Sequence, residues 1–193
     1  SICPTLIADK KMSQLADYSR LKQGKEARYL PQYYREVAWN PKHSNSLANV
    51  RGLPSLYFKN LGLLHERTRH ILPFLQKCTN ILAGSDTPNP FVIPGFSLLQ
   101  ELELLVNVGL KPYQALECAT YNPAKFLDVL PQLGTVENGK LANLLLLRFN
   151  PLERILNLKT IEGIFLNGHY LSKAMLQKNM NNDCLTLIQG NFA

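Results

Sequence analysis

The sequence lacks any apolar run long enough to cross a lipid bilayer. Its densest stretch, Leu141–Leu147, is interrupted by Asn143 and ends at Arg148, whereas a membrane-spanning helix needs about 20 apolar residues. No signal peptide is visible either, because Ser1–Pro4 does not open a positive segment followed by an apolar one. We therefore expect a cytoplasmic protein that does not enter a membrane.

Cysteine is scarce, and its four positions lie far apart. The cysteines are Cys3, Cys78, Cys118 and Cys184, and no two of them form a C-x-x-C pair. This spacing argues against a zinc knuckle and against a compact disulfide framework. We expect reduced and mostly buried thiols, which agrees with a cytoplasmic location.

Charge is also sparse, at 18% of the residues, and it is unevenly distributed. The net charge of the chain is +7. Residues 1–80 hold 13 Lys and Arg against 5 Asp and Glu, so the positive charge is concentrated there. These basic residues are scattered, so a solvated basic face is favoured over a nucleic-acid site. Hydrophobic residues make up 46% of the chain, which is enough for a core and excludes wholesale disorder.

The first 80 residues show strand and helix patterns in alternation. The short apolar segments Ile2–Ile7 and Asn80–Gly84 predict two buried strands. Helical spacing occurs between them, at residues 11–22, 24–38 and 56–78, with a turn-rich loop at 39–54. Pro73 is expected to kink or split the last of these helices.

After the second strand the pattern is helical and then changes to strands. Phe96–Val108 predicts an amphipathic helix that ends at Gly109. Two shorter helices are predicted next, at residues 112–121 and 123–129. Beyond Pro131 the predicted strands are Leu133–Val136, Leu144–Leu147 and Thr160–Leu166, with a turn at Asn167-Gly168 into His169–Leu171 and a helix at 172–180.

Two strand–helix units do not enclose a core of their own. A parallel sheet needs both faces covered and its edges paired, and a complete (β/α)8 barrel takes roughly 250 residues. The pattern of the first 130 residues therefore fits either one quarter of a barrel or the end of a larger α/β sheet.

One loop holds the candidate chemistry. Ala83–Thr87 places Asp86 just past a predicted strand, where α/β folds position active-site groups, and Gly84 permits a tight turn there. A carboxylate in this position can bind a metal, accept a proton from water or orient a substrate amine. Alternatively, Asp86 caps the following helix or forms an Asx-turn before Pro88.

The four histidines do not supply an obvious metal site. His65 and His70 imitate a zinc-binding helix, but a spacing of five residues turns their rings about 140° apart, against about 40° for four. We interpret both as ordinary helix residues. His43 falls in a predicted loop and His169 beside a hairpin turn, and neither is expected to be a ligand.

Five sequence motifs follow one another in order between residues 81 and 168. They are Ile81–Thr87, Pro94–Val106, Gly109–Ala124, Leu133–Leu144 and Asn150–Gly168. Together they resemble the C-terminal part of the amidohydrolase superfamily, specifically its imidazolonepropionase-like and prolidase-like members. Residues 80–172 match well, and Ile2–Leu6 resembles the seventh strand of the family's barrel.

This resemblance implies a metal-dependent hydrolase of C–N bonds. The fold would be α/β, the last two βα units of a distorted (β/α)8 barrel (residues 1–130) plus part of a small β-sandwich (131–172) and a helical tail (173–193). Asp86 would touch a divalent metal, with zinc expected, and would carry a proton from the attacking water to the leaving nitrogen. Thr87 and Asn89 would contact a small amide or dipeptide substrate.

The family's other metal ligands are absent from the sequence. Its His-x-His motif, its bridging Lys or Glu and the histidines of its fifth and sixth strands have no counterpart, and Asn143 stands where the family commonly has Asp. The chain alone is thus expected to bind no metal and to be inactive. The alternative hypothesis is a non-catalytic module or complementing subunit that associates with itself or with a partner chain.

Overall fold

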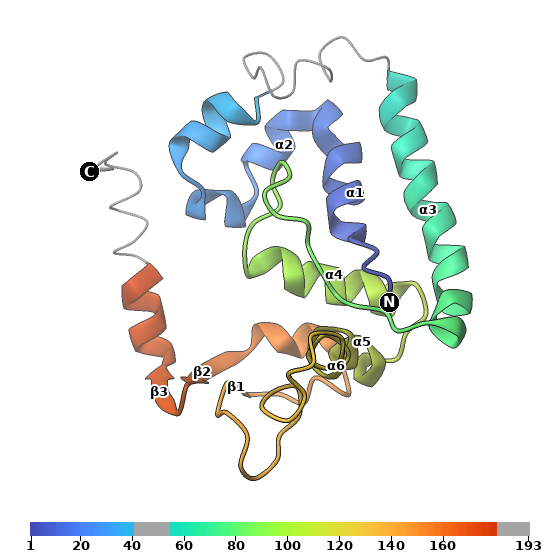
Figure 1. The fold of residues 1–193 in the computed structure, drawn as a ribbon. Helices are drawn as coiled ribbons and strands as arrows, with labels where there is room; N and C mark the ends of the chain where they lie inside the picture. Colours follow the sequence, from blue (N-terminus) through green and yellow to red (C-terminus); the bar gives the residue numbers. More distant parts are fainter. Residues whose placement is uncertain (41–54, 181–193) are drawn as a thin grey trace.

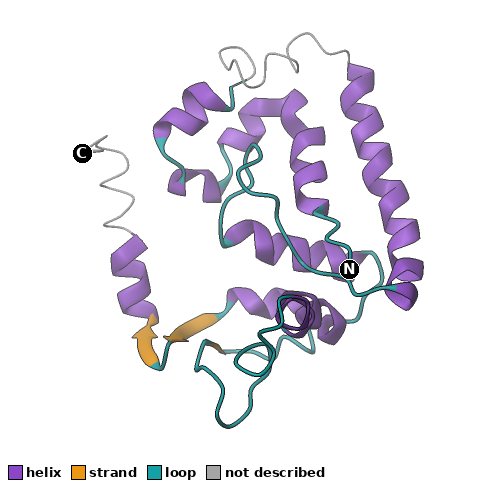
Figure 2. Cartoon of the chain, viewed as in Figure 1, coloured by secondary structure: helices purple, strands orange, loops and turns teal. Residues whose placement is uncertain are grey.

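A computed structural model describes residues 1–40 and 55–180, and most of the predicted loop 39–54 lies outside them. Helices dominate these residues, and the three named strands lie near the C-terminal end (Figure 2). In Figure 1, α1 (Leu6–Ser13) and α3 (Ser55–Cys78) run side by side, and α4 (Phe96–Asn107) passes across the end of α1. No helix of the described ranges has the length and apolarity that a membrane crossing requires.

The two predicted strands lie next to each other in parallel, but each is very short. Ile2 pairs with Ile81, the Ile2 amide donates to the Asn80 carbonyl at 2.9 Å, and the Leu82 amide donates to the Ile2 carbonyl at 2.8 Å. The predicted strand Ile2–Ile7 is therefore wrong beyond its first residues. The backbone turns at Thr5, whose φ of 47° is left-handed, and α1 begins at Leu6.

The helices predicted at 11–22 and 24–38 are divided into short turns. After α1 come η1 (Gln14–Asp17), α2 (Tyr18–Lys22), η2 (Lys25–Tyr29) and η3 (Tyr34–Ala38). This region closes over a small aromatic core in which Trp39 and Phe91 are buried. In contrast, α3 continues through Pro73, so the predicted split of that helix is wrong.

The helices after the second strand follow the prediction closely. α4 ends one residue earlier than expected, and Gly109 with its φ of +111° ends this segment because glycine adopts that conformation without strain. It is followed by α5 (Pro112–Ala119) and α6 (Tyr121–Phe126).

The C-terminal β unit is an antiparallel sheet in the order β1-β2-β3. Its strands are β1 (Leu144–Leu147), β2 (Ile161–Leu166) and β3 (His169–Ser172), with η5 (Ile155–Lys159) between the first two and a helix at 173–180 after the last. Asn167 and Gly168 form the predicted turn, both with positive φ. The predicted strand Leu133–Val136 is wrong, because Gly134 has a φ of +96°, which breaks an extended chain.

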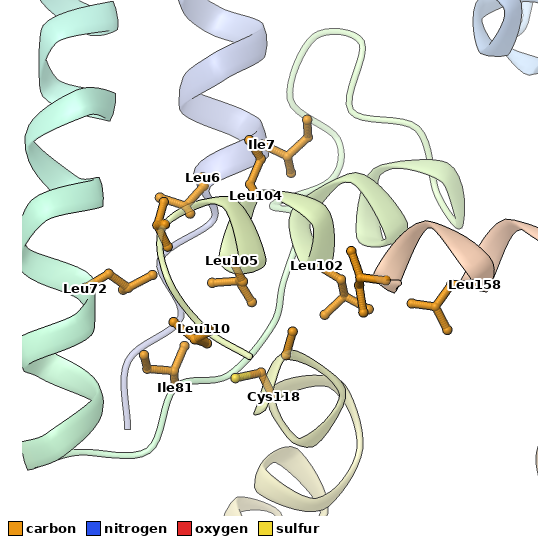
Figure 3. Close-up of a cluster of buried hydrophobic side chains, with 13 residues drawn as sticks. Leu6, Ile7, Leu72, Ile81, Leu102, Leu104, Leu105, Leu110, Cys118 and Leu158 are labelled. Atoms are coloured by element: carbon orange, nitrogen blue, oxygen red, sulfur yellow. The ribbon is translucent and has the colours of Figure 1, made fainter. Parts of the chain in front are cut away.

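The main core is centred on α4. Leu102 and Leu105 of that helix meet Leu6 of α1, Leu72 of α3 and Cys118 of α5 (Figure 3). Leu158 of η5 belongs to the same cluster, so the segment between β1 and β2 packs on the helices. This core holds the end of the second strand, and with it the candidate loop, in a fixed position.

Candidate functional site

The loop that carries Asp86 is anchored by the two strands and by α5 and α6. A Cβ added at Gly84 would lie 2.5 Å from Cys3 Sγ, so any other residue there requires the Cys3 side chain to move. The Ala83 amide donates to the Cys118 carbonyl at 2.7 Å, and Asn122 Nδ2 donates to the Ile81 carbonyl at 2.9 Å. Asn122 of the Asn-Pro-Ala motif thus secures the strand that precedes the loop.

Asp86 itself is exposed, and it has a left-handed φ of 56°. Asn89 Nδ2 donates to Asp86 Oδ2 at 2.7 Å and to the Asp86 carbonyl at 2.9 Å, while the Asn89 amide donates to the same carbonyl at 3.1 Å. These bonds orient one carboxylate oxygen within the loop. The carboxylate is accessible, which suits proton exchange with water or with a substrate.

The two structural alternatives for Asp86 do not fit this geometry. An Asx-turn needs the amide of the second residue along, and that residue is Pro88, which has no N–H. Capping of the next helix is also wrong, because α4 begins at Phe96 and its N-cap is Gly95. The hydrogen bond of the carboxylate goes instead to the Asn89 side chain.

Thr87 and Asn89, the two residues expected to contact substrate, lie in the same loop and differ in their environment. Asn89 is half-buried and its amide nitrogen is engaged by Asp86. Thr87 is exposed, and its Oγ1 lies 3.1 Å from Ser85 Oγ. Thr87 is therefore the one with a freely accessible side chain, whereas Asn89 orients the carboxylate.

Asp9, which the sequence analysis did not connect with Asp86, lies within its electrostatic reach. Burial raises the pKa of Asp9 on α1, His65 on α3 lowers it, and Asp86 raises it further. From helical spacing alone, His65 was interpreted as an ordinary helix residue. The side-by-side packing of α1 and α3, which no local pattern encodes, brings it near Asp9.

A second carboxylate, which the sequence analysis also did not single out, connects α4 with the start of α1. Glu101 on α4 is fully buried, and its two oxygens accept hydrogen bonds from the Leu6 amide at 3.0 Å and the Ile7 amide at 2.7 Å. Burial raises its pKa to about 7, although both amides lower it. An acidic residue at a buried position of the α4 pattern was the only signal in the sequence.

The described residues do not form a metal site by themselves. Over residues 1–40 and 55–180, no group of three or more His, Cys, Asp or Glu side chains is placed to hold an ion. Asp86 offers one accessible carboxylate, and a single carboxylate does not hold a catalytic ion. His70 and His169 are exposed on α3 and β3, and His43 lies outside the described residues.

Two other residues of the motifs, Asn143 and Lys140, have clear hydrogen-bond partners in the structure. Asn143, which stands where an Asp is common, accepts a hydrogen bond from the Asn167 amide at 2.7 Å through its Oδ1. Lys140 forms a hydrogen bond with Thr135 Oγ1 and lies 3.6 Å from a Glu137 carboxylate oxygen. Asn143 thus supports the hairpin turn of the β unit and Lys140 the turn before β1, and both are far along the chain from the Asp86 loop.

Comparisons with known proteins identify one family for most of the chain. The family described as the Amidohydrolase family matches residues 17–175. A search of curated protein sequences found no match.

Three solved structures resemble this fold. A Xaa-Pro dipeptidase with bound methionine has a TM-score of 0.59 at 20% identity, with 88% of this chain and 34% of that chain covered. The bottromycin amidohydrolase AH has a TM-score of 0.71 at 20% identity, with 96% and 40% covered. For a prolidase, described as putative, from Bifidobacterium longum, the values are 0.54 at 27% identity, with 71% and 35% covered. The chain has an α/β amidohydrolase-like fold, and it spans two fifths or less of these proteins.

Proposed function

The chain belongs to the amidohydrolase family, and from that premise we propose that it contributes the proton-transferring carboxylate of a hydrolase that cleaves amide-type C–N bonds. The observation that carries this proposal is the exposed carboxylate of Asp86 directly after the parallel pair Ile2 and Ile81. In this proposal residues 1–130 are the last two βα units of a barrel, 131–172 belong to the adjoining sandwich and 173–193 form a tail. The substrate is a small amide or dipeptide.

The chemistry follows from the accessibility of the carboxylate. Water adds its oxygen to the carbonyl carbon of the amide and gives a proton to Asp86. When the C–N bond breaks, Asp86 returns that proton to the leaving nitrogen, so the carboxylate is regenerated. Asn89 holds the carboxylate in place during both transfers.

The divalent metal expected in the complete enzyme, with zinc as the favoured ion, needs ligands beyond the described residues. Asp86 is the one accessible carboxylate that the loop offers, and it does not form a chelating set with its neighbours. We therefore expect the isolated chain to hold no zinc and to be inactive. The neighbours of known structure are two and a half to three times longer than their matched portion, which supports a larger catalytic unit.

The test uses the natural polypeptide or complex that contains this chain, purified under native conditions. Asp86→Asn should lower kcat for dipeptide or acyl-amide hydrolysis about 10²- to 10⁴-fold, the usual contribution of general acid–base catalysis. Asp128→Asn is the matched control, because Asp128 is also exposed and has a φ of 59°. Full activity of Asp86→Asn, or no amide hydrolysis by the natural form, would overturn the proposal.

A second candidate function, a complementing subunit or interaction module, is favoured by the outer face of α3. Leu56, Leu63 and Phe74 lie within about 20° of one another around the helix, and all three are exposed, Phe74 to 68%. Leu72, about 160° away, is fully buried in the core. The exposed Arg67 lies on the same outer face, so the three side chains form an apolar row beside a charge, and an exposed apolar row of this kind marks a surface that a partner covers.

The occupant that fits this face is the preceding part of an amidohydrolase barrel, or a second copy of this chain. Light scattering on the isolated chain distinguishes a chain that self-associates from a monomer that folds on its own. Self-association that Leu63→Glu abolishes, with Lys59→Glu as an exposed control on the same helix, supports the module. A monomer with a cooperative melt would contradict it.

A further inference from the structure

An aromatic hollow lies beside the Asp86 loop. It has a volume of about 350 Å³, and its walls include Tyr29, Tyr34, Trp39 and Phe96 as well as Thr87 and Pro88. The other described residues of its wall are aliphatic, proline or methionine, and none of the described wall residues carries a charge. Small-molecule pockets are about 300 to 1,000 Å³ and are lined mainly by such side chains.

The rings of this hollow are braced by one another and by the smaller core. Tyr34 and Trp39 have ring centroids 5.1 Å apart, and Trp39 lies 5.6 Å from the buried Phe91. Across the hollow, Tyr29 and Phe96 stack at 5.0 Å. Because the rings are held in contact, little order has to be created when a ligand enters.

The hollow adjoins the loop of Asp86. Thr87 and Pro88 belong both to its wall and to that loop, so a group bound there lies against the residues that follow Asp86 in the sequence. A larger hollow of about 440 Å³ between α1, α2 and α4 shares no residue with this loop, and its wall includes Lys10, Lys11 and Arg20. The two cavities thus differ both in charge and in their relation to Asp86.

We propose that the hollow formed by Tyr29, Tyr34, Trp39 and Phe96 beside Thr87 binds an uncharged aromatic side chain of the amide substrate. A charged side chain would lose its hydration there without finding a partner. An aromatic ring gains both apolar burial and edge or stacking contacts with the ring walls. The assignment of the ligand as substrate rests on the proposed function, whereas the binding preference does not.

The probe is N-acetylphenylalanine amide, and the reporter is built into the wall. Trp39 is the single tryptophan of the chain, so its fluorescence reports on this hollow alone. We expect a saturable change with this probe on the full chain. N-acetylglycine amide lacks the side chain and N-acetyllysine amide carries a charge, so both should bind at least ten-fold more weakly.

Two exposed tyrosines, one in the wall and one outside it, give a matched pair of variants. Tyr34→Ala removes a wall ring and should weaken binding about two- to twelve-fold, the value of an aromatic contact of 0.5 to 1.5 kcal/mol. Tyr113→Ala, on α5, removes a ring that is 60% exposed and outside the wall, and it should leave the affinity unchanged. Calorimetric titration confirms each value independently of fluorescence, and a thermal melt shows that each variant is folded.

The outcomes separate this inference from the proposed function. No saturable binding, equal binding of the three amides, or equal losses in the two variants would overturn the inference. Asp86→Asn should leave the affinity for the phenylalanine probe unchanged, because the hollow is complete without its charge. Selective binding in a natural form that cleaves no amide would leave the aromatic site intact and overturn only the proposed hydrolase.

Discussion

Two carboxylates on neighbouring segments, Glu101 and Asp86, have opposite environments. Glu101 is sealed between α1 and α4 and accepts two backbone amides, whereas Asp86 is exposed in a loop and accepts one side-chain amide. The first joins parts of the chain that are 95 residues apart. The second is bonded only locally, which leaves it available to water and ligands. The contrast separates a residue that maintains the fold from one suited to chemistry.

Removal of the buried carboxylate should have the largest effect on stability. Glu101→Ala leaves the amides of Leu6 and Ile7 buried without acceptors, and each such loss costs about 1 to 3 kcal/mol. We expect urea denaturation to show a decrease of about 2 to 5 kcal/mol in the free energy of unfolding.

The controls lie on the same helix and in the loop. Glu103→Ala removes a partly exposed ion pair with Lys159 and should cost less than about 1 kcal/mol. Asp86→Asn should stay within about 0.5 kcal/mol of the wild type. A loss for Asp86→Asn as large as that for Glu101→Ala would remove the distinction between the two carboxylates.

The pH dependence of stability should identify Glu101 more specifically. Its pKa is raised from 4.5 to about 7 in the folded protein, so the folded state binds the proton more tightly than the unfolded chain does. The free energy of unfolding should therefore fall as pH rises from about 4.5 through 7, by at most about 3 kcal/mol.

The variant Glu101→Gln isolates this contribution from the other titrating groups. The carboxamide has no proton to lose in this range, so the difference in unfolding free energy between wild type and variant should change with pH between 4.5 and 7. Denaturant melts at four pH values would measure it. A difference that stays constant over this window would contradict the assignment.

These two carboxylates also show how far the sequence predicts the structure. Asp86 could be singled out as a candidate because its position after a short apolar segment is a local signal, and local signals also predicted α4 and the turn at Asn167-Gly168. Glu101 was missed because its partners lie on α1. The same contact explains why the predicted strand failed at Leu6, where distant acceptors make a helix start possible.

The aromatic hollow could not be predicted for a similar reason. Its rings come from residues 29–39, where no motif is recognised, and from Phe96 in the motif Pro94–Val106, and nothing in the sequence connects these distant segments. The spacing at 24–38 predicted one helix, whereas the structure has the two short segments η2 and η3. Packing on Phe91 decides where these turns lie, and that is a long-range contact.

A substitution at Gly84, which supports the Asp86 loop, should lower the free energy of unfolding by less than Glu101→Ala does. Gly84→Ala would place a Cβ 2.5 Å from Cys3 Sγ, and overpacking of this kind costs about 1 to 3 kcal/mol. The double variant Gly84→Ala/Cys3→Ala should recover much of this loss, since the sulfur is gone. Equal thermal denaturation of the single and double variants would show that the two strand ends do not meet as described.

The smallest effect should come from the position where the family commonly has an aspartate. Asn143 Oδ1 accepts the Asn167 amide at 2.7 Å, and a carboxylate at the same place would make a charge-assisted bond, which is stronger. Asn143→Asp should therefore stabilise the protein by a few tenths to about 1 kcal/mol. Asn138→Asp, in an exposed turn of the same unit, is the matched control and should have no effect beyond its charge. If the two changes shift the melting temperature equally, the hydrogen bond from Asn167 does not distinguish the positions, and the β unit is held by its strands alone.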